Sequence, residues 1–353
     1  MYVPKFSISN GILRNIGQIE AAKEVIETAP LVPDFERDFQ TDAVVRQVYH
    51  GTHIEGNTLS MDQTKQVLDG ERIFARDRDV QEVINYRQVV KLLDELKEAR
   101  AGYDLTALLD IHAAVVYNIV PREKAGKIRE TQVVVKEEGS GRIIFSPPGP
   151  VELPYLLEDF INWLETGVAK ENHPVIIAAI VHYVLSAIHP FVDGNGRAAR
   201  AFAMLVMLKE GYDIKRFFAI EEHFDRDLDR YYEAFFKVDR QSAEISQRDL
   251  TAWIEYFTES LAVELVKIKE KVKKLSIDSQ LRVKIGQQIS LSPRQMKLVE
   301  YLSQNGKAGM RELKEVFPMV SEDTILRDIK GMKERGIIDK EGSTKAAVYV
   351  LRR

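Results

Sequence analysis

The most constraining feature of the sequence is an apolar segment, PVIIAAIVHYVLSAI, at residues 174–188. Its first residue is proline, which suits the first position of a helix because no N–H is left unpaired there. Apolar side chains occupy nearly every face of this helix, so it must be buried all round. With 15 residues it is shorter than the roughly 20 that a membrane span needs, and we predict the buried central helix of a soluble protein. We expect His182 in this helix and His112 on another apolar segment to be hydrogen-bonded core residues.

Helical periodicity dominates the first 270 residues, as in residues 80–100, where apolar positions recur every three or four residues. The exception is residues 131–144, where β-branched residues flank a polar turn, Glu138, Gly139, Ser140 and Gly141. We predict a β-hairpin here, which Pro147 and Pro148 end. An isolated hairpin is marginal unless it packs on the protein or takes up another strand.

The last part of the chain has a different order of elements. Helical segments at 292–305, 310–317 and 321–335 precede two strand patterns, 337–340 and 346–351, with a polar tip between them. Three helices and a two-stranded wing resemble a winged helix-turn-helix domain. The expected organisation is a helical region at 1–100, a core at 101–275, a linker at 276–291 and a winged helix-turn-helix domain at 292–353.

Composition excludes several kinds of chemistry. The sequence contains no cysteine, which rules out disulfides, thiolate nucleophiles and cysteine-based zinc sites. The N-terminal MYVPKFSISN lacks the order of a signal peptide, so we expect a cytoplasmic protein with no membrane partner. The net charge is −4, but residues 281–353 hold 15 Lys and Arg against 9 Asp and Glu. This uneven charge predicts a separate partner for the C-terminal region.

The segment after the apolar helix, HPFVDGNGRAAR at residues 189–200, contains an anion cradle. Gly194, Asn195 and Gly196 can turn the chain sharply and leave the backbone N–H groups unobstructed. A helix follows, and the free N–H groups at a helix N-terminus favour bound phosphate. A glycine-rich turn alone is usually only a turn, so the prediction depends on the residues around it.

Those residues supply the other parts of a transfer reaction. Arg197 and Arg200 are three apart on one face of the helix, which lets both guanidinium groups reach further phosphates. Asp193 is a suitable single carboxylate for Mg²⁺, which completes its shell with phosphate oxygens and water. His189 is placed to take a proton from an attacking hydroxyl. The combination predicts nucleotidyl or phosphoryl transfer.

The same twelve residues match throughout the signature of the Fic family, and the resemblance extends over residues 1–275. Fic enzymes typically move AMP from ATP to a Ser, Thr or Tyr hydroxyl of a target protein and release pyrophosphate. The resemblance therefore implies a mainly α protein with a Fic-type helical core and a β-hairpin flap. It also implies ATP as the donor and Mg²⁺ as the metal.

The resemblance also assigns roles to residues. His189 is the implied general base, Asp193 the implied Mg²⁺ ligand, and the hairpin 131–144 the implied docking strand for the target segment. Tyr231 and Tyr232 resemble a tyrosine pair near the adenine, although the asparagine often found later is Asp239 here. The residues expected to bind the nucleotide are Gly194, Asn195, Gly196, Arg197, Arg200, Val133, Val134, Val135, Lys136, Tyr231 and Tyr232.

The segment GTHIEGN, at residues 51–57, resembles the inhibitory motif of some Fic proteins. By that resemblance Glu55 forms a bidentate ion pair with Arg200 and takes the place of the γ-phosphate. One departure is Gly51, which stands where a small hydroxyl residue is usual, with Thr52 one place later. The same glutamate is an alternative candidate for orienting a water that removes AMP from a modified target.

The winged helix leaves a second function open. Its segment 321–335 carries Arg327, Lys330, Lys333 and Arg335, which favour DNA, but acidic residues near its start oppose docking on phosphates. The candidate partners are DNA, another protein or a second copy of the chain. Our main hypothesis is a protein adenylyltransferase that Glu55 inhibits. The alternative is a DNA-binding transcriptional regulator that uses a Fic core as a nucleotide sensor.

Overall fold

The computed structural model describes residues 2–31, 33–98, 102–136, 143–285, 291–318, 320–342 and 347–352. The chain divides into two compact units, which are described separately. Unit 1 consists of Met1–Glu27 and Arg37–Ile268, and unit 2 of Thr28–Glu36 and Lys269–Arg353.

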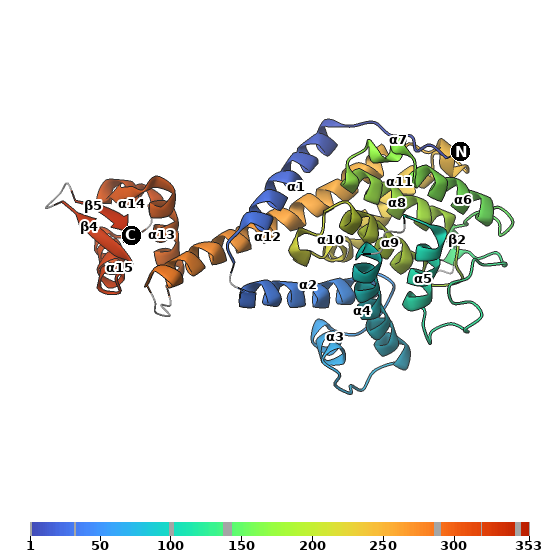
Figure 1. Cartoon of the computed structure of the whole chain (residues 1–353), viewed down its shortest axis with the longest axis horizontal. Coiled ribbons are helices and arrows are strands. Elements are labelled where there is room, and N and C mark those ends of the chain that lie inside the picture. The colour runs from blue at the N-terminus through green and yellow to red at the C-terminus, as the bar shows by residue number, and fades with distance from the viewer. Residues whose placement is uncertain are drawn as a thin grey trace. The chain divides into compact units, whose positions relative to one another are not determined.

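Unit 1 is mostly helical, as the sequence predicts (Figure 1). The helices that lie in it wholly or in part are α1 Asn10–Thr28, α2 Pro33–His53, α3 Met61–Leu68, α4 Asp77–Glu98, α5 Leu105–Val115, α6 Leu153–Leu164, α7 Gly167–Lys170, α8 Pro174–Ile188, α9 Asn195–Lys209, α10 Ile220–Arg226, α11 Leu228–Asp239 and α12 Thr251–Ile285. Two 3-10 helices, η1 and η2, span Ile214–Arg216 and Ile245–Gln247.

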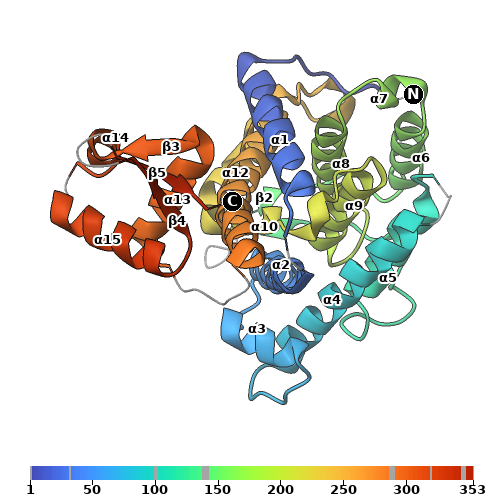
Figure 2. The same cartoon turned by 60° about the vertical axis from the view of Figure 1, so that its left-hand side comes forward.

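Helices α8 and α9 form the centre of unit 1, and Figures 1 and 2 both show them side by side. Helix α8 begins and ends where the apolar segment predicts, and 13 of its 15 residues are buried. Full burial of each large apolar side chain contributes about 1.5–3 kcal/mol, so the buried side chains of this pair stabilise the core. The site loop, which we define as residues 189–194, joins the two helices at the end of α8.

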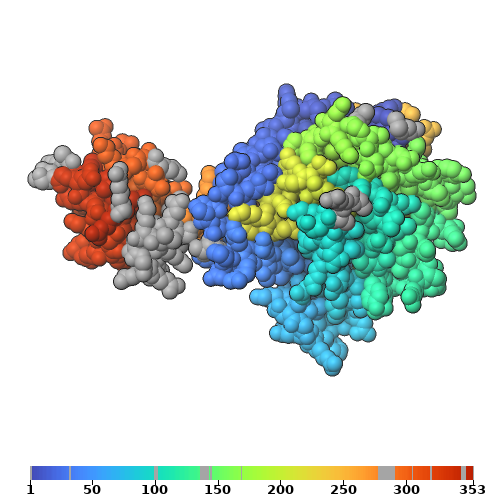
Figure 3. Space-filling model, viewed as in Figure 1, coloured from blue at the N-terminus to red at the C-terminus, as the bar shows by residue number. Residues whose placement is uncertain are grey.

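Other helices cover this central pair. Helix α4 packs against both α5 and α9 and begins three residues before the predicted segment 80–100. Helix α3 lies against α4, and Figure 3 shows this part of the chain standing out from the surface of unit 1. Phe74, in the segment between α3 and α4, is fully exposed.

A short hairpin forms where the sequence predicts one. Strand β1, Val135–Lys136, pairs with the antiparallel strand β2, Ile143–Phe145. The register opposes Val135 to Phe145 and Lys136 to Ile143. The predicted turn, Glu138 to Gly141, lies outside the described residues. Among the described strands, β1 and β2 pair only with each other.

Helix α12 is longer than the sequence analysis expected. It continues to Ile285, so the first ten residues of the predicted linker 276–291 are helical. The physical reason is that no glycine or proline interrupts the chain between residues 251 and 285. Residues 286–290 lie outside the described residues.

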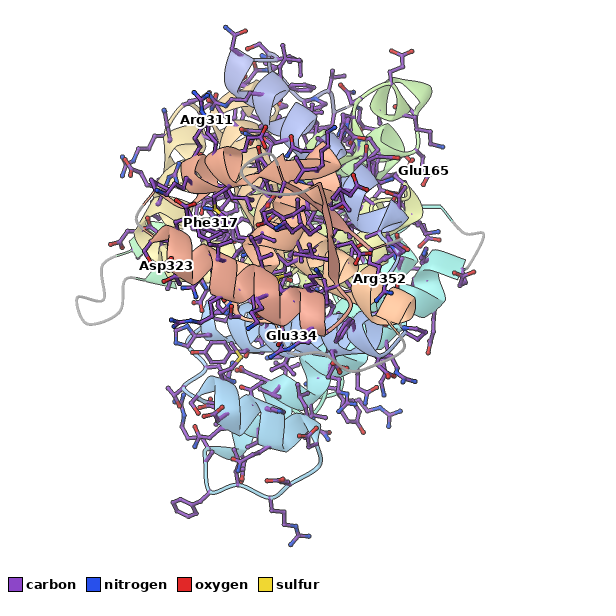
Figure 4. All side chains as sticks on the ribbon, turned by 90° about the vertical axis from the view of Figure 1, so that its left-hand side faces the viewer. Glu165, Arg311, Phe317, Asp323, Glu334 and Arg352 are labelled. Atoms are coloured by element: carbon purple, nitrogen blue, oxygen red, sulfur yellow. The ribbon has the colours of Figure 1, made fainter. Side chains whose placement is uncertain are left out.

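Unit 2 contains the predicted winged helix-turn-helix fold. Its helices are α13 Pro293–Asn305, α14 Met310–Val316 and α15 Glu322–Glu334, and its strands are β3 Lys307–Gly309, β4 Ile338–Glu341 and β5 Val348–Leu351. The strand order is β3-β5-β4, and both pairs are antiparallel. Strand β3 was not predicted, because three residues between two helices leave too short a pattern to recognise. Figure 4 looks onto this unit, where the labels Asp323 and Glu334 mark the ends of α15.

Buried apolar side chains from all three helices and the sheet make a separate core in unit 2. Within the described parts of both units, no helix is both long enough and apolar enough to cross a membrane.

Candidate active site

His189 ends α8 in a left-handed backbone conformation, with φ 52° and ψ 58°. This conformation costs a residue with a side chain about 1–2 kcal/mol and is typical of functional sites. Its Nδ1 lies 3.2 Å from the carbonyl oxygen of Ser186. A carbonyl only accepts hydrogen bonds, so we assign the proton to Nδ1, which leaves the lone pair of Nε2 free.

The electrostatic surroundings keep this imidazole neutral. Burial lowers the pKa of His189, and the nearby cation of Arg129 lowers it further. The Ser186 carbonyl and the carboxylates of Glu55 and Asp193 oppose this shift without reversing it. His189 is therefore neutral at pH 7, as a proton acceptor must be.

Asn195 closes the site loop through two hydrogen bonds to the backbone of Phe191. Its Oδ1 accepts from the Phe191 N–H at 2.8 Å, and its Nδ2 donates to the Phe191 carbonyl at 2.9 Å. Gly194 has a φ of 76°, and a Cβ there would lie 2.7 Å from Cγ1 of Val116. Glycine is therefore required by both conformation and space. The side chain of Asn195 shapes the loop, and its amide is already engaged by Phe191.

His112 of α5 supports the loop from behind. Its Nδ1 accepts from the Gly126 N–H at 3.0 Å, so Nε2 carries the proton and donates to the Asp193 carbonyl oxygen at 3.0 Å. Its ring stacks on Phe191 with centroids 3.6 Å apart. Burial lowers the pKa of His112 to about 4. His112, which we expected to be a hydrogen-bonded core residue, therefore also holds the site loop in place.

Two buried arginines belong to the first two turns of α9. Arg197 and Arg200 are 2% and 4% exposed. Among the described residues, neither Nε atom has a hydrogen-bond partner. A buried N–H without a partner costs about 1–3 kcal/mol, which an oxygen of a bound anion would offset. The pair therefore has the donors that an oligophosphate needs.

Glu55 lies in the turn after α2 and reaches Arg200. Its Oε1 accepts from Nη2 of Arg200 at 2.8 Å, and the same Nη2 donates to the carbonyl of Gly51 at 2.9 Å. The contact is one hydrogen bond and not the expected bidentate pair, because Nη2 is shared with Gly51. A Cβ added at Gly196 would clash with Oε1 of Glu55, so the carboxylate covers the first turn of α9. It occupies the place that favours an anion.

Asp193, the expected metal ligand, is held between two arginines. Its Oδ2 lies 2.7 Å from Nη2 of Arg78, and its Oδ1 lies 3.2 Å from Nη2 of Arg197. Burial alone would raise the pKa of this carboxyl, but the two arginines hold it below its usual value. No cluster of three metal-binding side chains occurs among the described residues. A lone ionised carboxylate fits Mg²⁺, which takes its other ligands from phosphate and water, once Arg78 releases Oδ2.

Glu82 of α4 links these arginines to the Glu55 segment. Its Oε1 lies 3.1 Å from Nε of Arg78 and 3.2 Å from Nη1 of Arg197. Its Oε2 accepts from Nδ2 of Asn57 at 3.0 Å. Neither Arg78 nor Glu82 was predicted, since charged residues on an amphipathic helix carry no sequence sign of their partners.

A cavity of about 160 Å³ brings half of the predicted site residues together. His189, Gly196 and Arg200 line it, and so do Glu55, Tyr231 and Tyr232. Tyr231 is 3% exposed, and its hydroxyl lies 3.1 Å from Nε2 of His182.

The flap residues divide into two groups. Val135 lines the cavity, together with Phe145 from the opposite strand. Val133 and Val134 do not line it, and Val134 is 38% exposed. The side chain of Lys136 lies outside the described residues. Phe235, Phe236 and Asp239 of α11 also line the cavity; Asp239 was noted only as a departure from the family pattern.

Comparison with known proteins adds two family matches. Residues 102–207 match the Fic/DOC family, and residues 294–341 match the DeoR-like helix-turn-helix domain. The protein adenylyltransferase Fic of Drosophila grimshawi is 33% identical over 182 residues, and that of Drosophila melanogaster is 32% identical over the same length. Each alignment covers 50% of this chain and 35% of the relative, so the match spans about a third of those proteins.

Solved structures show the same fold. A Fic family protein from Desulfovibrio desulfuricans superposes with a TM-score of 0.65 at 20% identity, covering 99% of this chain and 98% of that one. A Fic domain containing signaling protein from Bacteroides thetaiotaomicron gives 0.62 at 24% identity, covering 73% of this chain and 97% of that one.

Proposed function

The chain carries a domain of the Fic/DOC family, and from this premise we propose that the protein moves AMP from ATP to a hydroxyl of a target protein. One observation carries the proposal: a neutral His189 with a free Nε2 lines the same cavity as Arg200 and the first turn of α9. A proton acceptor and an anion site thus face one space of about 160 Å³.

The reaction needs one bond to form and one to break. Nε2 of His189 takes the proton of the target hydroxyl while its oxygen attacks the α-phosphorus of ATP. The bond between the α-phosphorus and the bridging oxygen breaks, and pyrophosphate leaves. The N-terminus of α9 and the free N–H groups of Arg197 and Arg200 hold the phosphates. Bound at Asp193, Mg²⁺ would neutralise phosphate charge.

The target is proposed to dock on the hairpin 131–144. The described strands β1 and β2 have no third partner, and Ile143 is 56% exposed. An extended segment of another protein can pair with such an open edge through its backbone. This arrangement would bring the target hydroxyl toward His189, because Phe145 of β2 lies 6.1 Å from its ring.

Glu55 is proposed to inhibit the reaction. Its carboxylate covers the first turn of α9 and occupies Nη2 of Arg200, so an ATP phosphate and Glu55 compete for one place. Glu55 also faces His189 across the cavity, and the alternative that it orients a water for AMP removal rests on this proximity. Release of AMP from a pre-modified target by wild type, with none from Glu55→Gly, distinguishes the alternative.

The test of the main proposal is the mass that the protein gains. We expect purified Glu55→Gly protein with Mg²⁺ and ATP to gain the mass of AMP, and Glu55→Gly/His189→Ala to gain nothing. Separate incubations with the other nucleoside triphosphates and with a phosphocholine donor identify the group transferred. If folded Glu55→Gly protein transfers no group from any of these donors, either to itself or to the proteins of an added extract, the proposal fails.

A second candidate function is DNA binding by unit 2, which the DeoR-like match favours. Arg327, Lys330 and Lys333 are exposed on α15. Glu322 and Asp323 stand in its first turn and oppose phosphate there. A gel shift that weakens steeply with salt and is lost in Arg327→Ala/Lys330→Ala would support DNA binding.

A further inference from the structure

A buried arginine that was not among the predicted site residues links the β-hairpin to the site loop through hydrogen bonds. Arg129 lies two residues before the hairpin and is 3% exposed. Its Nε donates to the carbonyl of His189 at 2.9 Å. Its Nη1 donates to the carbonyl of Thr131 at 3.0 Å, and its Nη2 to that of Pro148 at 2.7 Å.

These three carbonyls belong to separate segments of the chain. Thr131 lies in the segment that leads into β1, Pro148 lies in the segment after β2, and His189 is the first residue of the site loop. A guanidinium is planar and rigid, so this one side chain holds the carbonyl oxygens of Thr131, Pro148 and His189 at fixed positions relative to one another. The Arg129 backbone N–H adds a bond to the Pro190 carbonyl at 2.9 Å.

The cation itself has an unusual environment. Within the part of the chain that the structure describes, no carboxylate pairs with Arg129, and its partners are three carbonyls and the side-chain oxygen of Gln132. Burial lowers its pKa from the usual value, yet arginine stays charged at neutral pH. Burying a charge without a counter-ion costs free energy. A neutral side chain could link these segments at a lower cost if the role of Arg129 were purely structural.

The backbone of His189 explains why a charged side chain is needed at residue 129. His189 has the left-handed backbone of a strained residue, and its N–H is bonded to Leu185 while its carbonyl is bonded to Arg129. These two hydrogen bonds fix the peptide planes on either side of the His189 Cα, and with them the direction of its Cα–Cβ bond. The charged groups that face this ring among the described residues are Arg129, Glu55 and Asp193.

We infer that Arg129 is a positioning residue that sets the distance between the flap-bound target and His189 and holds its cation beside the imidazole. The inference rests on the proposed function for the target, but its geometry does not. Arg129 is absent from the cavity lining, so it acts through His189 and the hairpin and leaves the nucleotide contacts unchanged.

Two substitutions separate the geometry from the charge. Arg129→Lys keeps the cation but cannot reach three carbonyls, whereas Arg129→Gln loses both. In the Glu55→Gly background we expect kcat for AMP transfer to fall roughly 100-fold in both variants, the effect of misplacing a reacting group by about 1 Å. The KM for ATP should stay unchanged. Arg216→Gln is the control, because Arg216 also donates to a backbone carbonyl, that of Val90, but lies outside the cavity lining.

The readout that a merely structural role would not move is the titration of His189, followed by NMR of histidine-labelled protein and assigned with His189→Ala. We expect its pKa to rise in Arg129→Gln and to stay near the wild-type value in Arg129→Lys. Amide exchange should quicken at residues 131–136 and 143–148 in both. Circular dichroism checks that each variant is folded.

The outcomes are distinct. An unchanged His189 pKa in folded Arg129→Gln, or wild-type kcat in both variants, overturns the inference. If Arg129→Gln does not fold, Arg129→Lys still tests it, since unchanged kcat and exchange in that variant overturn it as well. If the parent Glu55→Gly transfers nothing, the proposed function fails, while the titration and exchange still test the role of Arg129.

Discussion

Replacing Glu55 with alanine should speed AMP transfer by an amount that follows from its contact with Arg200. The bond joins two charged groups at 2.8 Å, and such bonds contribute about 1.5–3 kcal/mol. The Glu55 side chain is 28% exposed, so water screens the contact and the lower part of that range, about 1.5–2 kcal/mol, applies. ATP binding to wild type must break this bond, and binding to Glu55→Ala need not. The difference corresponds to a kcat/KM about 10- to 30-fold higher in Glu55→Ala.

The assay is the initial rate of self-labelling with ATP radiolabelled at the α-phosphate, at ATP concentrations below KM. Glu55→Gln should lie between wild type and Glu55→Ala, because its neutral amide keeps a weaker bond to Arg200. The control is Glu259→Ala, which removes a carboxylate that pairs with Arg230 at 2.6 Å outside the cavity. Equal kcat/KM for wild type and Glu55→Ala would refute the reasoning, and so would a faster Glu55→Gln than Glu55→Ala.

Three further predictions concern the loop and the charges behind it. Asn195→Ala removes both bonds to the Phe191 backbone, and urea unfolding should show a loss of about 2–3 kcal/mol. His112 has a pKa of about 4 when folded and about 6.5 when unfolded, so as pH falls from 6.5 to 4 the unfolded state takes up the proton. Wild type should lose about 3 kcal/mol more than His112→Gln over that range in pH-dependent unfolding. Arg78→Ala frees Oδ2 of Asp193, and titration of transfer rate with Mg²⁺ should show half-saturation at a lower concentration than in wild type.

Elements that are set by neighbouring residues follow from the sequence, whereas elements that depend on distant partners do not. The bounds of α8 were predicted to the residue, because a proline start and an apolar run are local properties. The extension of α12 through residues 276–285 was missed because weak periodicity there was taken for a linker. Strand β3 exists only because β5 pairs with it, and nothing in three residues announces that pairing.

The candidate site shows the same division. His189, Gly196 and Arg200 come from one continuous segment, and they line one cavity. Arg78, Glu82 and Arg129 contact Asp193, Arg197 and His189, respectively, and each of these partners is at least 60 positions away in the sequence. Their residue types are those of ordinary helix surfaces and loops. Only contacts across the fold distinguish them.

The sequence by itself determined the chemistry that is built from neighbouring residues: an anion cradle, two arginines and a histidine in twelve positions. It also determined the helical core, because apolar spacing decides which faces must be buried. The tertiary structure decided how these groups are used, since charge and hydrogen bonding depend on distances in space. The Ser186 carbonyl holds the proton of His189 on Nδ1, which leaves the lone pair of Nε2 free. The fold also places Glu55 over the first turn of α9 and pairs Arg78 with the carboxylate of Asp193.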